Sequence, residues 1–113
     1  MKASLDATLV ALADPTRRRI VHHLRRGPCR AGDLAQVCEM SPPALSRHLR
    51  VLRGSGLVAE RAVEDDARVR LYVLRPQRLA ELRRWLDEVE SLWSAQLDAF
   101  KAHVEATRGR RRR

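Results

Sequence analysis

The sequence predicts a small, mainly helical fold that carries one β-hairpin, and three observations indicate it. Leucines recur at helical spacing in several short stretches separated by Pro and Gly. Apolar and polar residues alternate near residue 70, as in a half-buried strand. A long stretch with apolar residues every three or four positions closes the chain. With 113 residues the chain has the size of one domain. We expect that domain at residues 1–107 and a basic, disordered tail at residues 108–113.

Three short helices are expected in the first forty residues. Apolar residues at helical spacing in 5–13 predict the first. Asp14 followed by Pro15 predicts the start of the second, because Asp caps a helix N-terminus and Pro is tolerated at its first position. Gly27 ends this helix. The third helix is expected to have Asp33 as its cap and to bury an apolar stripe behind it.

A fourth helix is predicted from Ser41, a good N-cap that is followed by Pro42. Its leucines fall on one face, and Gly54 and Gly56 end it. An arginine-rich face lies opposite the leucines. Such a helix can lie in a DNA major groove, where Arg binds guanine edges or phosphates, although a solvated surface helix would carry the same residues. The residues off the leucine face are Ser46, Arg47, Arg50 and Arg53.

A β-hairpin is predicted directly after this helix. Residues 57–63 and 68–73 read as strands, and the polar run 64–67 as the turn between them. Two short helices, a tight turn and a basic second helix make a helix-turn-helix, and an added hairpin makes a winged helix. The expected order is therefore four helices, two strands and a fifth helix.

The fifth helix is expected to run from Pro76 to about Ala106, roughly 45 Å. A domain this small cannot bury so long an apolar stripe by itself, and an exposed stripe implies a partner. The simplest partner is a second copy related by a two-fold axis, with the first helix taking part. The alternative is a helix that covers the core of its own subunit. The residues expected at the dimer contact are Leu5, Leu9, Leu86, Val89, Trp93, Leu97 and Phe100.

The charge of the chain favours a polyanionic partner. The formal net charge is +9, and the bases concentrate in residues 17–70 and at the C-terminus, while acids dominate residues 86–107. Nucleic acid is a better match than a membrane surface. No stretch resembles a spanning helix or a signal peptide, so we expect a cytoplasmic protein. No glycine-rich phosphate loop, carboxylate pair or nucleophile–base pair is visible, so we expect neither catalysis nor a cofactor.

Taken together, residues 12–20, 45–52 and 56–58 resemble the arsenical-resistance-repressor (ArsR/SmtB-type) family of bacterial winged-helix regulators. The resemblance covers nearly the whole chain. It implies a homodimeric repressor that binds an inverted repeat in double-stranded DNA near its own operon and is released by an effector.

Two metal-binding signatures of that family are missing here. The positions of its Cys-x-Cys run hold Ala31, Gly32 and Ala35, and the last helix has His103 without the Asp-x-His pair. The chain therefore resembles the members that do not bind metal. The hairpin turn is acidic at residues 64–66, where the family often has Gly-Arg. Because acids repel phosphate, we expect the flanking arginines rather than the tip to contact DNA.

The two cysteines leave open a thiol-based sensor as an alternative. Cys38 falls on the apolar stripe of the third helix and reads as a small core residue. Cys29 lies beside Arg26 and Arg30, whose charge would favour the thiolate. A repressor that responds to oxidation through Cys29 and Cys38 is therefore a variant of the main hypothesis.

The main hypothesis is a sequence-specific DNA-binding regulator, and the alternative from another class is a winged-helix adaptor that binds protein. Steep dependence of DNA affinity on salt would separate them. The residues expected at or near the bases are Ser41, Pro43, Ala44, Ser46, Arg47 and Arg50. The residues expected at phosphates are Arg17, Arg53, Arg61, Arg68 and Arg70.

Overall fold

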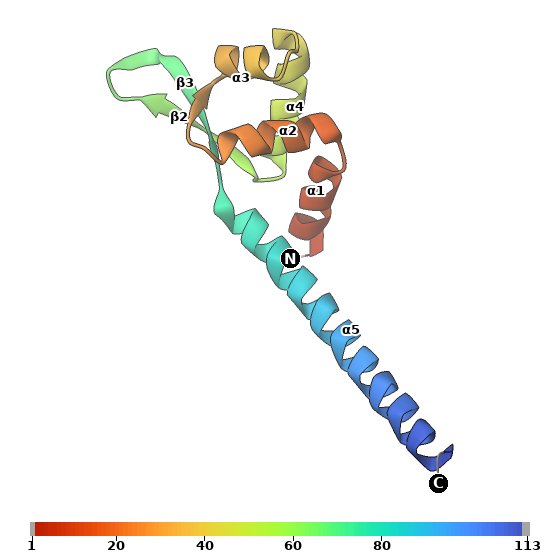
Figure 1. Cartoon of the computed structure of the whole chain (residues 1–113). Helices are drawn as coiled ribbons and strands as arrows, with labels where there is room; N and C mark the ends of the chain where they lie inside the picture. The colour runs from red at the N-terminus through yellow and green to blue at the C-terminus, as the bar shows by residue number, and fades with distance from the viewer. Residues whose placement is uncertain (1, 112–113) are drawn as a thin grey trace. The chain divides into compact units, whose positions relative to one another are not determined.

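The computed structural model describes residues 2–111, which are mainly helical with a small antiparallel sheet (Figure 1). This confirms the predicted fold class. The chain divides into two compact units, residues 1–82 and residues 83–113, and the second is formed by α5 alone among the described residues. The elements are α1 (Lys2–Leu12), α2 (Pro15–Leu24), β1 (Cys29–Arg30), α3 (Ala31–Val37), α4 (Pro42–Gly54), β2 (Val58–Val63), β3 (Asp66–Leu74) and α5 (Pro76–Arg111).

Two of the three predicted helix caps are confirmed. The Asp14 carboxylate accepts hydrogen bonds from the backbone N–H groups of Thr16, at 2.7 Å, and Arg17, at 3.2 Å. The bond from Arg17 is the main cause of the lowered pKa of Asp14. The Ser41 hydroxyl accepts from the N–H of Ala44 in the same way. Both helices therefore begin where the sequence predicted.

Two expectations about helix ends are wrong. Asp33 does not cap α3: the helix starts at Ala31 straight after β1, its cap position is Arg30, and Asp33 lies inside the first turn. There its negative charge still suits the positive end of the helix dipole. Residues 108–111, expected in a disordered tail, continue α5 because arginine is a good helix former and Gly109 alone does not stop it. Residues 112 and 113 lie outside the described part of the chain.

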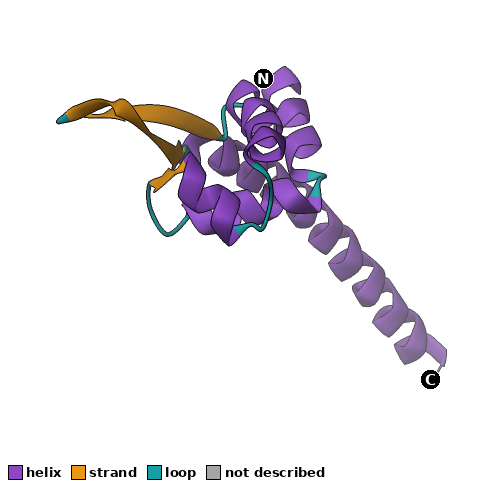
Figure 2. Cartoon of the chain, turned by 90° about the horizontal axis from the view of Figure 1, so that it is seen from above, coloured by secondary structure: helices purple, strands orange, loops and turns teal. Residues whose placement is uncertain are grey.

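The sheet has three strands in the order β1-β3-β2, all antiparallel. Figure 2 draws the strands in orange beside the helices. The predicted hairpin is confirmed as β2 and β3, with a register irregularity between Ala62 and Val63. Its turn is shorter than expected, because Asp66 and Ala67 already belong to β3. The sequence analysis missed β1, whose Cys29 pairs with Tyr72. A strand of two residues is too short to show alternation, so its existence depends on β3 being in place.

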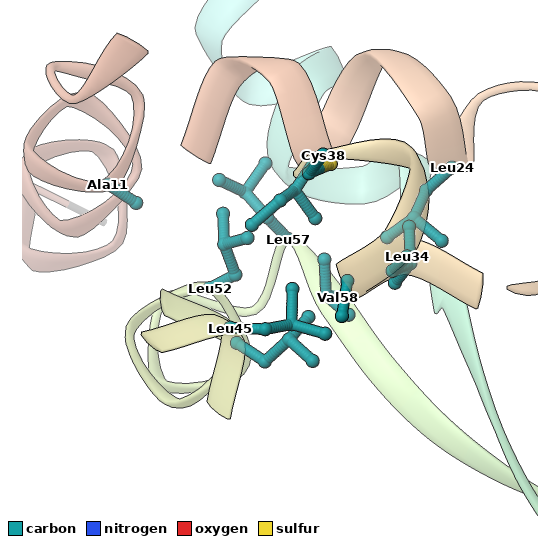
Figure 3. Packing of buried hydrophobic residues seen from close by; sticks show 11 residues of the cluster. Ala11, Leu24, Leu34, Cys38, Leu45, Leu52, Leu57 and Val58 are labelled. Carbon is teal, nitrogen blue, oxygen red and sulfur yellow. The ribbon is translucent and has the colours of Figure 1, made fainter. Parts of the chain in front are cut away.

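The core of residues 1–82 is built on the leucine face of α4. Leu45, Leu49 and Leu52 are each at most 2% exposed, as the spacing predicted. Figure 3 shows two of them turned toward side chains of α2, α3 and the start of β2. Cys38 belongs to the same cluster, which confirms it as a core residue. Burying a leucine contributes about 1.5–3 kcal/mol, so three such residues fix the rotation of α4 about its axis. The other buried members are Ala11, Ile20, Leu24, Leu34, Ala35, Leu57 and Val58.

The two glycines that end α4 differ in what they require. Gly54 is the last helical residue, and nothing would lie within 4 Å of a Cβ added there. Ser55 is the cap residue, and its hydroxyl donates to the Leu52 carbonyl at 2.8 Å. Gly56 has φ +83°, and a Cβ there would meet the Arg78 side chain at 2.7 Å. Of these two glycines, only Gly56 has a backbone conformation that requires glycine.

Arg17 is a structural residue rather than a surface cation. Its side chain is 15% exposed. Its guanidinium donates to the carbonyl oxygens of Ala11, at 2.7 Å, and Val10, at 3.1 Å, and lies 3.5 Å from Nδ1 of His48. One side chain thus holds the end of α1 against α2 and α4. The sequence analysis placed Arg17 among the phosphate contacts, and the structure instead directs it inward.

The substitution Gly56→Ala should lower the free energy of unfolding by about 1–2 kcal/mol, the cost of a left-handed conformation for an L-residue. Gly54→Ala is the matched control, and it should leave stability unchanged or raise it by up to about 1 kcal/mol. Urea denaturation followed by circular dichroism measures both. Equal effects of the two substitutions would contradict the assignment.

Replacing Arg17 by Ala should destabilise the fold by about 1–3 kcal/mol, because carbonyl oxygens of α1 lose a charged donor. Arg26→Ala is the matched control, because it removes the same charge from an exposed side chain just after α2. It should change stability by less than about 0.5 kcal/mol. Thermal unfolding at one salt concentration distinguishes them. If Arg17→Ala unfolds like the wild type, the bonds to α1 do not contribute to stability.

Candidate nucleic-acid interface

The outer face of α4 presents the residues predicted to approach the bases. Five of these residues are exposed, and Ala44 is half-buried. The five are Ser41, Pro43, Ser46, Arg47 and Arg50. Ser41 is exposed even though its hydroxyl caps the helix. Among the described residues, no carboxylate lies within 4 Å of the guanidinium of Arg47 or Arg50. Both charges are therefore available to a partner outside the chain.

Arg53, one turn further on, has a partner on the sheet. Its Nη2 lies 3.5 Å from Oε2 of Glu60, and its side chain is about half exposed. The other oxygen of Glu60 accepts a hydrogen bond from the Tyr72 hydroxyl at 2.8 Å. Burial, and then this bond, raise the pKa of Tyr72. The three side chains link α4 to both strands of the hairpin.

Sequence reasoning missed Glu60 and Tyr72 as part of this site. The two residues are direct cross-strand partners in the register of β2 and β3. A correct hairpin register would have paired them, because opposite residues on one face lie about 5 Å apart. The contact of Glu60 with Arg53 joins a strand to a helix, and the spacing of residues in the sequence does not predict it.

The three hairpin arginines are exposed, but they do not share one face. Ala62 pairs with Arg70, and Arg61 pairs with Leu71. Because side chains alternate across a sheet, Arg61 lies on the face opposite Arg70. Arg68 stands two residues before Arg70, and its backbone N–H donates to the Asp66 carboxylate at 3.0 Å. The acidic turn residues Glu64 and Asp65 are exposed, as the sequence indicated.

The cysteines lack the electrostatics of reactive thiolates. Burial raises the pKa of Cys29, and Asp33 raises it further, so the expected lowering by neighbouring arginines is wrong. Burial also raises the pKa of Cys38. Both shifts favour the protonated thiol, the form in which cysteine is a poor nucleophile.

Residues 2–111 contain neither a metal-binding cluster nor a membrane-spanning helix. No group of three or more His, Cys, Asp or Glu side chains in this part of the chain is placed to hold a metal ion. No helix in the same range combines the length and apolarity needed to cross a membrane.

Comparison with known proteins places the chain. Residues 14–60, which include α2, α3 and α4, match the family model described as "Bacterial regulatory protein, arsR family". The HTH-type transcriptional regulator Rv2034 of Mycobacterium tuberculosis is 39% identical over 103 residues, which are 91% of this chain and 91% of that protein.

Solved structures agree with the sequence comparison. An ArsR-like transcriptional regulator from Rhodococcus sp. RHA1 matches with a TM-score of 0.76 and 31% identity, over 88% of this chain and 92% of that one. A structure described as a possible transcriptional regulator for arsenical resistance matches with a TM-score of 0.63 and 44% identity, over 83% of this chain and 92% of that one. The chain therefore belongs to the ArsR family of bacterial helix-turn-helix transcriptional regulators, which are not enzymes.

Proposed function

We propose that the chain is a homodimeric, cytoplasmic repressor that binds an inverted-repeat operator in double-stranded DNA through α4. The observation that supports it best is the division of α4 into a buried leucine face and an outer face with two arginines that have no carboxylate partner in the described part of the chain. A helix anchored in this way presents its side chains in one fixed direction. Groove recognition needs that rigidity, because base contacts depend on side-chain placement.

The proposed base contacts are made from the first three turns of α4. Arg47 and Arg50 carry the charge, and a guanidinium that bonds both O6 and N7 of a guanine is the commonest specific contact in a major groove. The smaller residues that accompany them are Ser41, Pro43, Ala44 and Ser46. The proposed phosphate contacts are Arg53, Arg61, Arg68 and Arg70. Arg17 is left out, since its guanidinium is bonded within the fold.

A second copy of the chain is proposed to cover the apolar stripe of α5. The five predicted contact residues of this helix are between 47% and 67% exposed. Within residues 83–111 no other element is present to cover them. An unbroken apolar stripe of this length in water favours self-association. Those residues are Leu86, Val89, Trp93, Leu97 and Phe100. In α1, Leu9 is also exposed and Leu5 is half-buried.

Dimerisation and DNA binding support one another in this proposal. Two copies related by a two-fold axis present two α4 helices to successive major grooves, about 34–36 Å apart on one side of the duplex. The matching operator is an inverted repeat with half-sites one helical turn apart. Two half-sites also multiply the specificity that one short helix provides.

Arg47→Ala should weaken binding to operator DNA by about 5- to 150-fold, the range expected for a lost bidentate base contact of about 1–3 kcal/mol. Arg110→Ala removes an exposed arginine near the end of α5 and should have a much smaller effect. Fluorescence anisotropy with DNA from upstream of the gene, repeated at several salt concentrations, measures both. Equal losses, or an affinity that does not respond to salt, would count against DNA reading by α4.

The double substitution Trp93→Glu with Phe100→Glu should convert a dimer into monomers, because four charges would face each other across the contact. Ala102→Glu is the matched control, since it lies about 200° around the helix from Phe100. Sedimentation velocity reports the mass of each variant. A wild-type protein that sediments as a monomer at micromolar concentration would refute the proposed dimer.

A further inference from the structure

An open cleft of about 620 Å³ lies between the second half of α4, the edge strand β2 and the residue that follows β3. Three guanidinium groups and a single carboxylate line it. The guanidinium groups belong to Arg50, Arg53 and Arg75, and the carboxylate to Glu60. The rest of the lining is formed by small residues, namely Gly54, Val58 and Ala59.

The charges that line the cleft do not cancel. Glu60 is paired with Arg53 at 3.5 Å. Among the described residues, neither Arg50 nor Arg75 has a carboxylate within 4 Å. The lining therefore carries an excess of two positive charges. An anion in the cleft would offset the repulsion among the three guanidinium groups.

A backbone hydrogen bond fixes the position of Arg75. Its N–H donates to the carbonyl of Leu57 at 2.8 Å, which ties the end of β3 to the start of β2. A second hollow of about 210 Å³ is lined by Gly56, Arg75, Gln77 and Arg78. Arg78 is bonded to Glu81 at 2.8 Å, whereas Arg75 has no carboxylate partner among the described residues.

We propose that this cleft binds a phosphate group, with Arg75 as a contact residue. A guanidinium matches a phosphate with two parallel hydrogen bonds, and Arg is the residue suited to such planar, bidentate recognition. The excess of two positive charges matches a phosphate monoester, which carries about −1.5 to −2 at neutral pH. The phosphate comes from a small phosphorylated molecule or from the DNA backbone, and the DNA case rests on the function proposed above.

Glu60 is an internal competitor for this phosphate. It forms an ion pair with Arg53 at 3.5 Å, and the Tyr72 hydroxyl holds it in that position. A phosphate that enters the cleft must share Arg53 with it. Glu60→Gln keeps an oxygen that accepts from Tyr72 and removes the negative charge. The substitution therefore tests the effect of the negative charge on phosphate binding while the packing of the site stays the same.

The test titrates inorganic phosphate into the full-length protein in a chloride buffer of low ionic strength, followed by calorimetry. Arg75→Ala should weaken binding about tenfold or more, the effect of losing a charge-assisted contact of at least about 1.5 kcal/mol. Glu60→Gln should strengthen it. Arg26→Ala, which removes an exposed arginine at the end of α2, should leave it unchanged. The same four proteins are then titrated with operator DNA.

The two titrations identify the source of the phosphate. Weaker binding of inorganic phosphate by Arg75→Ala, with unchanged DNA affinity, assigns the cleft to a free phosphorylated ligand. A loss in both titrations assigns it to a phosphate site that the DNA backbone occupies in the complex. A loss confined to the DNA titration assigns it to the DNA backbone. The proposal is overturned if Arg75→Ala behaves like Arg26→Ala in both titrations, or, where Arg75→Ala does not fold, if Glu60→Gln strengthens neither interaction. A wild type that binds no DNA speaks against the repressor function alone.

Discussion

The burial of the leucine face of α4 is the constraint on which the rest of the first unit depends. A helix has a fixed angular spacing, so burying Leu45, Leu49 and Leu52 decides at the same time which residues face outward. The packing energy of three leucines therefore sets the direction of Arg47 and Arg50, without any contact that involves those arginines. The proposed recognition of DNA by α4 is, in physical terms, a consequence of core packing.

The helices and the hairpin could be predicted because their signals are local. Caps, leucine spacing and strand alternation lie within a few residues of one another, and Asp14 and Ser41 mark helix starts as expected. The strand β1 and the start of α3 could not be predicted, since both depend on β3, forty residues away. Asp33 is a good cap in isolation, but strand pairing starts the helix three residues earlier, with Arg30 at the cap position.

The site could be predicted only in part, because one residue type serves several purposes here. Arg17 joins α1 to α4, Arg53 pairs with Glu60, and Arg47 has no carboxylate partner among the described residues. All three are arginines near a predicted DNA-binding helix, and a net charge of +9 does not distinguish them. The three arginines differ in whether an oxygen that can pair with the guanidinium lies close to it in the folded chain. For Arg17 these acceptors are carbonyl oxygens, which no sequence pattern displays.

Arg50 and Arg53 belong both to the outer side of α4 and to the wall of the cleft. Any ligand in the cleft therefore changes the charge that α4 offers to DNA. A free phosphate would neutralise part of that charge and place a like charge beside the DNA backbone, so the two would weaken each other's binding by the same factor, as linkage requires. A DNA phosphate in the cleft would instead add to the contacts of the same helix. In this proposal, the position of Arg75 beside α4 connects the occupant of the cleft to operator affinity without a change of fold.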